Sequence, residues 1–218
     1  MKTALLFGAS GLVGGHLLNQ LIKDNNYSKI KLFVRSVPQI SDPKIEIIET
    51  DFNNLENQKE DIKGDDCFFC IGTTKQNSSD KNEYKRVELD VPKKIAQIAK
   101  SNLVNSFVFV SSGYADPNSS GDYLKFKGLV EEELKRLSFS KLGIMRPSFL
   151  MGDRKEKRVG EKVGIFIFKL LSPLFLGPLE KMKPIHSKKV AKAMVEITNR
   201  DFKQNVFESN EIVEVSNS

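Results

Sequence analysis

The chain has 218 residues, 39% of them hydrophobic, which is enough for one domain with a substantial core. No apolar run reaches the ~18 residues of a membrane span, and the N-terminus shows a strand pattern without a cleavage site. We therefore expect neither an integral membrane segment nor a signal peptide. The net charge of +6 is uneven, because residues 151–192 hold 11 Lys and Arg against 4 Asp and Glu. This excess indicates either a solvated surface or attraction to an anionic partner.

The cysteines and histidines argue against a disulfide and a metal site, and the missing sequence motifs argue against nucleic-acid binding. Cys67 and Cys70 stand three residues apart on an expected strand, so their side chains should point to opposite faces. We expect two buried structural thiols in a reducing, cytoplasmic protein. His16 and His186 cannot complete a zinc site, and we expect no metal. The chain has no tryptophan, zinc finger or RNA-binding aromatic motif, so we expect no nucleic-acid partner.

Hydrophobic periodicity predicts strands and helices that alternate along the chain. Expected strands cover residues 2–7, 30–35, 44–49, 66–71, 106–110 and 142–145, with short final strands at 205–208 and 212–215. Expected helices cover residues 12–24, 82–101, 121–137, 163–172 and 187–199, the last with Ser187 as its N-cap. This order predicts an α/β fold, a Rossmann-type doubly wound parallel sheet with helices on both faces. We expect a single domain over residues 1–218 with a small C-terminal extension.

The rest of the chain is organised around a glycine turn near its start. Residues 2–18 read KTALLFGASGLVGGHLL, an apolar strand followed by three glycines and an apolar-periodic helix. Gly8 lets the chain reverse, Gly11 lets the backbone approach a pyrophosphate, and Gly14 lets the helix pack closely on the sheet. A helix N-terminus aims free N–H groups at such a turn, so the stretch predicts nucleotide binding.

Ligands bind at the carboxyl ends of the strands in such sheets, so the residues that follow each strand are informative. Arg35 and Ser36 follow the second strand, where an NAD site would usually hold an acid for the ribose 2′-hydroxyl. An arginine there would pair with a 2′-phosphate, which favours NADP(H) over NAD(H). Asp51 and Phe52 follow the third strand. The carboxylate suits either the adenine amino group or a helix N-cap, and the ring suits the adenine pocket.

The fourth and fifth strands are followed by small and hydroxyl residues. Gly72, Thr73 and Thr74 come after the fourth strand, where a glycine admits the ribose and nicotinamide half of a dinucleotide. Ser111 and Ser112 come after the fifth strand, and a hydroxyl there can hold a substrate carbonyl.

Tyr123 and Lys127 form a Y-x-x-x-K pair on the helix that follows these serines. Residues at i and i+4 share a helix face, so the phenol and the ammonium point the same way. A free phenol has a pKa of about 10, and a nearby ammonium favours the phenolate and brings that pKa toward the working range. The pair therefore indicates acid–base catalysis.

Taken together, GASGLVG, CFFCIGTT, VSSGYA, YLKFKGLVEEEL and IMRPSFLMGDR resemble an atypical short-chain dehydrogenase/reductase, most closely of the Tat-interacting-protein-like group. The resemblance covers about residues 2–155. It implies that Tyr123 transfers a proton, Lys127 binds the nicotinamide ribose, and Ser112 orients the carbonyl, with Ser111 in reserve. It implies a cofactor site made of Gly8, Ser10, Gly11, Leu12, Val13, Gly14, Arg35, Ser36, Asp51, Phe52, Gly72, Thr73, Thr74, Ser111, Tyr123, Lys127, Pro147 and Ser148. Ser148 departs from the glycine that the family often has after this proline.

The resemblance implies an NADP(H)-dependent oxidoreductase that transfers hydride to or from a small carbonyl or alcohol substrate. Two alternatives stay open: an NADP(H)-binding regulatory or interaction protein with little turnover, and a nucleotide-sugar epimerase or dehydratase. Only 68 residues follow Leu150, which disfavours a nucleotide-sugar pocket. The intact Ser112, Tyr123 and Lys127 favour the oxidoreductase.

Our expectations about the substrate side of the site and about assembly come from the C-terminal part and from two long helices. Residues 151–186 would form the substrate side of the site or a lid. Within them the apolar stretch 164–177, preceded by the basic run 154–158, suits core cover, a lid, a dimer surface or a membrane-surface helix. The superfamily implies a homodimer through the helices at 82–101 and 121–137.

Overall fold

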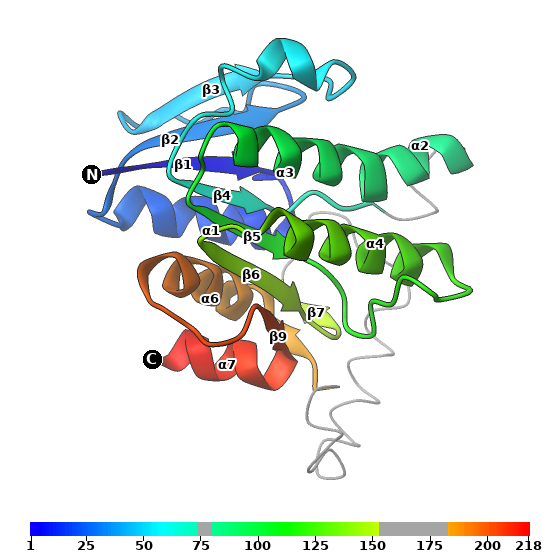
Figure 1. The fold of residues 1–218 in the computed structure, drawn as a ribbon. Coiled ribbons are helices and arrows are strands. Elements are labelled where there is room, and N and C mark those ends of the chain that lie inside the picture. Colours follow the sequence, from blue (N-terminus) through cyan, green and yellow to red (C-terminus); the bar gives the residue numbers. More distant parts are fainter. Residues whose placement is uncertain (74–79, 153–182) are drawn as a thin grey trace.

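The computed structural model describes residues 1–73, 80–152 and 183–218, and a seven-stranded parallel sheet lies at its centre (Figure 1). Its strands are β1 (Lys2–Phe7), β2 (Tyr27–Val34), β3 (Ile45–Glu49), β4 (Asp66–Phe69), β5 (Ser106–Val110), β6 (Lys141–Arg146) and β9 (Val206–Glu208). The strand order is β3-β2-β1-β4-β5-β6-β9, and neighbouring strands all run parallel. The order reverses between β1 and β4, which is the topological switch point where doubly wound sheets bind ligands.

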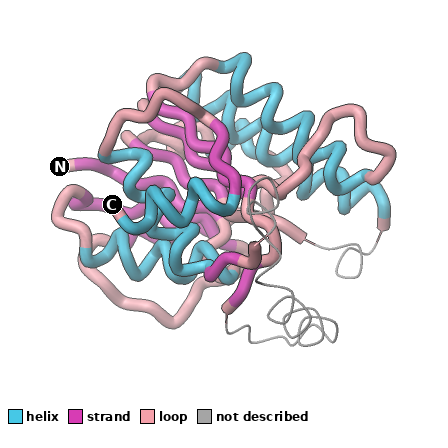
Figure 2. The backbone as a smooth tube through the Cα atoms, turned by 90° about the horizontal axis from the view of Figure 1, so that it is seen from below, coloured by secondary structure: helices cyan, strands magenta, loops and turns pink. Residues whose placement is uncertain are grey.

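Helices cover both faces of the sheet, as Figure 2 shows from below. One face carries α1 (Leu12–Lys23), α6 (Ser187–Asn199) and α7 (Ser209–Asn217). The other face carries α2 (Lys81–Lys85), α3 (Val91–Ser101) and α4 (Asp122–Leu137). A 3-10 turn (Leu55–Gln58) follows β3, and β7 (Leu150–Met151) pairs with β8 (Ile185–His186) in a small second sheet. This architecture confirms the predicted Rossmann-type α/β fold.

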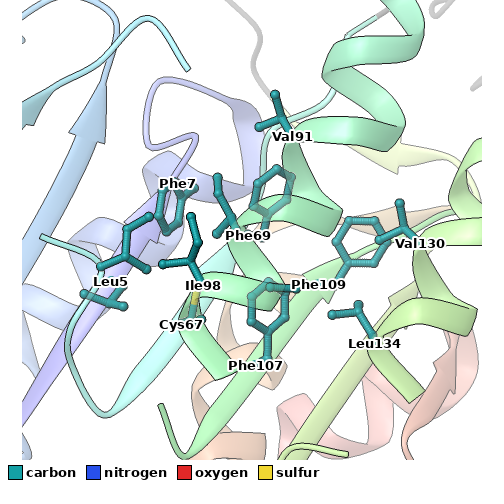
Figure 3. Close-up of a cluster of buried hydrophobic side chains, with 14 of the residues drawn as sticks. Leu5, Phe7, Cys67, Phe69, Val91, Ile98, Phe107, Phe109, Val130 and Leu134 are labelled. Atoms are coloured by element: carbon teal, nitrogen blue, oxygen red, sulfur yellow. The ribbon is translucent and has the colours of Figure 1, made fainter. Parts of the chain in front are cut away.

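Alternation along the strands builds two separate cores. Leu5, Phe7, Cys67 and Phe69 point toward α3 and α4, as Figure 3 shows for this cluster. Ala4, Leu6 and Phe68 point toward α1 and α6 on the opposite face, because successive strand residues alternate sides. Strands buried on both faces read as continuous apolar runs, which is why the sequence identified the central strands.

The cysteines follow the same alternation. Cys67 is fully buried in the core under α3 and α4, whereas Cys70 packs with the α1 and α6 core and its thiol lies 4.0 Å from the Met194 sulfur. Both are free thiols on opposite faces, as their spacing predicts. Burial raises the pKa of the Cys70 thiol to about 12, which keeps it protonated and unreactive at neutral pH.

The helix expected over residues 82–101 is interrupted by a π-helical turn, Arg86–Asp90. The N–H of Val91 donates to the carbonyl of Arg86, five residues back. Pro92 lies just beyond the turn. It has no N–H, and its ring would clash with the carbonyl of Glu88 in a regular α-helix, which explains why the helix widens here.

The C-terminal region differs in detail from the sequence expectation. Residues 212–215 belong to helix α7 and not to a strand, because Glu208 and Glu211 form a reciprocal capping box at the start of that helix. Helix α6 begins at Ser187, but its N-cap is His186, whose Nδ1 accepts from the N–H of Lys188. The helix expected at 163–172 lies outside the described residues. Among the helices of the described ranges, none is long and apolar enough to cross a membrane.

Candidate cofactor and active site

The passage from β1 into α1 requires glycine both in the turn, at Gly8, and in the first turn of the helix, at Gly14. Gly8 has a φ of +88°, and a Cβ there would lie 2.8 Å from the backbone of Cys70 and Ile71. A Cβ at Gly14 would lie 2.1 Å from the carbonyl oxygen of Gly8. Gly11 is exposed as the N-cap of α1, whose first turn has no side-chain cap and no acidic residue. The N-terminus of α1 therefore presents backbone N–H groups that suit a phosphate.

A cleft of about 430 Å³ opens at the switch point between β1 and β4. Of the residues expected to bind the cofactor, its lining contains Gly8, Ser10, Gly11, Arg35, Ser36, Phe52, Gly72 and Thr73. The other expected residues that the structure describes lie outside this lining: Leu12, Val13, Gly14, Asp51, Ser111, Tyr123, Lys127, Pro147 and Ser148. Thr74 lies outside the described residues. Glycine backbone forms one wall, so a dinucleotide could lie close against the chain.

The end of the cleft beyond β2 and β3 carries two arginines. Arg35 and Ser36 are exposed on the lining after β2. Arg86 reaches the same cleft from the π turn, donating through Nη1 to the carbonyl of Phe52 at 3.1 Å. Glu83 accepts from Arg86 Nε at 2.7 Å and Nη2 at 2.8 Å, and this hydrogen bonding lowers the pKa of Glu83. Because Arg86 already neutralises Glu83, this end can accept an anionic group.

Asp51 hydrogen-bonds within a local turn and does not line the cleft. One of its carboxylate oxygens accepts from the backbone N–H of Asn53 and the other from the Asn53 side chain, both at 2.8 Å. These hydrogen bonds lower the pKa of Asp51, which is exposed and outside the cleft lining. The capping alternative is also not met, since the N-cap of the following 3-10 turn is Asn54.

Lys127 lies behind Gly72, outside the cleft lining, and is only 3% exposed. Its Nζ lies 3.0 Å from Glu88 Oε2, 3.3 Å from the carbonyl of Val110, and 5.9 Å from the centroid of the Tyr123 ring. Burial lowers the pKa of Lys127, but Glu88 and Tyr123 outweigh burial, so this pKa is raised overall. Lys127 is therefore a buried cation paired with Glu88, and it lies near the ring of the exposed Tyr123 four residues earlier on α4.

The two serines after β5 have different environments. Ser111 is buried and donates to Glu131 Oε1 at 2.6 Å, and Arg146 clamps the same carboxylate through Nε and Nη2 at 2.9 and 2.6 Å. Ser112 is half-buried and donates only a 3.3 Å hydrogen bond to the carbonyl of Gly113. Ser111 therefore belongs to a structural network, which leaves Ser112 as the hydroxyl better placed to contact a substrate.

Pro147 and Ser148 have limited freedom to contact a cofactor. Pro147 is buried, and its carbonyl accepts from the N–H of Gly113 at 2.9 Å. The N–H of Ser148 donates to Ser209 Oγ at 2.7 Å, and its hydroxyl donates to the carbonyl of Lys183 at 2.5 Å. These bonds tie the end of β6 to the chain around α7 and β8.

Three charged residues of the cleft region were not singled out from the sequence: Glu83, Arg86 and Glu88. All three lie within the helix expected at 82–101, where charged residues normally belong to a solvated face. The available signal was Pro92, which cannot continue a regular helix and marks the π turn that carries Arg86 and Glu88. In residues 1–73, 80–152 and 183–218, no three His, Cys, Asp or Glu side chains group as a metal site.

A doubly wound sheet with a glycine turn and a cleft at its switch point defines a dinucleotide-binding protein. Residues 8–201 match the family described as NAD(P)H-binding. The chain belongs to this family, among the atypical short-chain dehydrogenases/reductases, as its motifs predict.

Relatives and solved structures agree with this assignment. The rat protein HTATIP2 is 34% identical over 164 residues, which cover 73% of this chain and 67% of the rat protein. The protein FMP52, mitochondrial, of Candida glabrata is 31% identical over 169 residues, covering 76% and 71% of the two chains. The Bordetella bronchiseptica enzyme WbmH in complex with NAD+ superposes with a TM-score of 0.71 at 16% identity, covering 95% and 75%. This last likeness concerns the fold alone.

Proposed function

We propose that this protein is an NADP(H)-dependent oxidoreductase acting on a small carbonyl or alcohol substrate. The observation that carries the proposal is the position of Lys127, which is buried behind Gly72 with its ammonium 5.9 Å from the centroid of the Tyr123 ring. A Cβ at Gly72, which lines the cleft, would lie 4.0 Å from Lys127 Nζ. Gly72, which has no side chain, therefore lies between this part of the cleft and the ammonium.

The chain's own residues divide the work of the reaction. NADPH supplies the hydride when bound. Ser112 would donate a hydrogen bond to the substrate carbonyl oxygen, and the Tyr123 hydroxyl would give that oxygen its proton. Lys127 would bind the ribose hydroxyls and stabilise the negative charge left on Tyr123. The glycine turn and the N-terminus of α1 would hold the pyrophosphate.

The preference for NADP(H) rests on charge at the far end of the cleft. Arg35 and Ser36 follow β2 without a nearby carboxylate in sequence, and Arg86 offsets the charge of Glu83 on the same lining, which leaves Arg35 available to a phosphate. A guanidinium pairs well with a phosphate and has nothing equivalent to gain from a ribose hydroxyl. The site therefore favours the cofactor that carries a 2′-phosphate.

Replacing Arg35 with alanine is expected to weaken NADPH binding by about 10- to 100-fold, because one charge-assisted contact to the phosphate is lost. NADH binding should change by less than about threefold, since NADH lacks that phosphate. Titrations followed by nicotinamide fluorescence measure both affinities. Arg136→Ala is a matched control, because Arg136 pairs with Glu133 on α4 and is not part of the cleft lining.

Two results would count against this proposal. If the wild-type protein binds neither NADPH nor NADH, the assignment of the cleft fails. If it binds both equally and Arg35→Ala changes neither, the NADP(H) preference fails while the cleft assignment stands. A cytoplasmic location, a homodimer and a substrate-side role for residues 151–186 stay predictions; the Candida glabrata relative carries a mitochondrial name.

A further inference from the structure

Glu88 is a buried carboxylate at the reaction end of the cleft that the proposed reaction does not yet use. It is 1% exposed and lies in the π turn that joins α2 to α3. Its Oε1 accepts from the backbone N–H of Thr73 at 2.5 Å, and its Oε2 lies 3.0 Å from Lys127 Nζ. One carboxylate therefore joins the turn after β4 to the ammonium on α4.

The carboxylate lies directly behind the floor of the cleft. A Cβ placed on Gly72 would meet Glu88 Oε1 at 3.6 Å and Lys127 Nζ at 4.0 Å, the nearest atoms in that direction. Gly72 itself is exposed and lines the cleft. The Glu88–Lys127 ion pair is thus one small residue away from the space that a nicotinamide ribose would occupy.

A buried lysine needs a partner to keep its charge. Burial alone favours the neutral amine, and the groups that face Lys127 are Glu88 from the π turn, Tyr123 from its own helix, and Cys70 after β4. Of these, Glu88 is the carboxylate and lies 3.0 Å from Lys127 Nζ, whereas Tyr123 contributes a phenol and Cys70 a thiol. Within the described ranges, the other close contacts of Lys127 Nζ are the Val110 carbonyl and the Phe109 ring.

We propose that Glu88 is a positioning residue that holds Lys127 charged and fixed between Tyr123 and the Gly72–Thr73 turn. This inference rests on the proposed oxidoreductase function, because Glu88 would act by holding Lys127 in the geometry that this function requires. Glu88 does not contact substrate; it acts through Lys127 and through the N–H of Thr73. The same carboxylate sets both the charge of the ammonium and the position of the cleft floor, so the two are coupled.

Glu88→Gln tests this role, since the amide keeps the size of the side chain and removes its charge. Selectively labelled lysine Cε groups can be followed by NMR against pH, with the Lys127 signal identified by its absence in Lys127→Arg. The Lys127 signal is expected to titrate at a lower pH in Glu88→Gln than in the wild type. NADPH affinity should fall about 10-fold, because a charge-assisted contact to the ribose is weakened.

Glu133→Gln is the matched control, because Glu133 is also largely buried but pairs with Arg136 on α4 and Gln97 on α3 and is not part of the cleft lining. It should leave the Lys127 titration and NADPH affinity unchanged. If Glu88→Gln does not fold, Glu88→Asp replaces it. The shorter side chain moves the carboxylate away from Lys127, so the Lys127 signal should again titrate at a lower pH, though with a smaller shift. An unchanged Lys127 titration in a folded Glu88 variant that binds NADPH would overturn the proposal alone. Absence of NADPH binding in the wild type would overturn the proposed function, and the positioning role with it.

Discussion

Replacing Tyr123 with phenylalanine is expected to lower NADPH-dependent carbonyl reduction by about 10²- to 10⁴-fold, the usual contribution of a positioned acid. The ring and its packing stay, but the hydroxyl that would protonate the carbonyl oxygen is lost. NADPH affinity should stay within about threefold of the wild type, because this hydroxyl contacts substrate more than cofactor. The measurement is the oxidation of NADPH against a panel of aldehydes, ketones and quinones.

Tyr114→Phe is the control for this experiment, because Tyr114 is also an exposed tyrosine near the end of β5 and has no assigned role. It should leave the rate unchanged. A Tyr123→Phe variant with full activity would show that the catalytic assignment is wrong. A wild-type protein that binds NADPH tightly but reduces none of the panel would favour the regulatory or interaction protein instead.

Gly14→Ala is expected to lower the free energy of unfolding by about 2–4 kcal/mol and to weaken NADPH binding by about 100-fold or more. The new Cβ would lie 2.1 Å from the Gly8 oxygen and 2.8 Å from its carbonyl carbon, and backbone atoms cannot move aside as a flexible side chain can. The start of α1 must shift away from the turn, which displaces the N–H groups expected to bind phosphate. Urea unfolding and nicotinamide fluorescence measure the two effects.

The neighbouring glycine provides the control for that change. A Cβ on Gly15 would lie 3.4 Å from the carbonyl oxygen of Ala9, an ordinary contact, and alanine favours a helix over glycine by about 1 kcal/mol. Gly15→Ala should therefore be neutral or stabilising and should bind NADPH normally. If Gly14→Ala behaved like Gly15→Ala, close packing of α1 on the glycine turn would not be a requirement of this fold.

The fold could be predicted from the sequence because its information is local and repeated. Apolar runs such as DCFFCI mark strands buried on both faces, and the glycine turn marks where β1 passes into α1. Residues 212–215 were misread because IVEV is rich in β-branched residues, which are typical of strands. The signal for a helix lay outside that stretch, in the Glu208 and Glu211 capping box.

The candidate site was harder to predict from the sequence, because its most important contacts join distant parts of the chain. Ser111 is held by a hydrogen bond to Glu131, which lies 20 residues away in the sequence. Ser148 is held by a hydrogen bond to Ser209, which lies 61 residues away. The spacing of Tyr123 and Lys127 was visible because it lies within one helix. Glu88 was not visible, because its inward direction depends on a π turn that helical periodicity does not reveal.

The π turn also suggests one way in which the cleft could differ among relatives of this chain. Each residue of an α-helix advances the chain by about 100°, so deleting one residue within Arg86–Asp90 and replacing Pro92 would allow a regular helix and rotate everything before it relative to α3. Arg86 would turn away from Phe52 at one end of the cleft, and the apolar face of α3 would remain in the core. Such a change could therefore remodel both ends of the cleft together, without any substitution at a residue that touches the bound molecule.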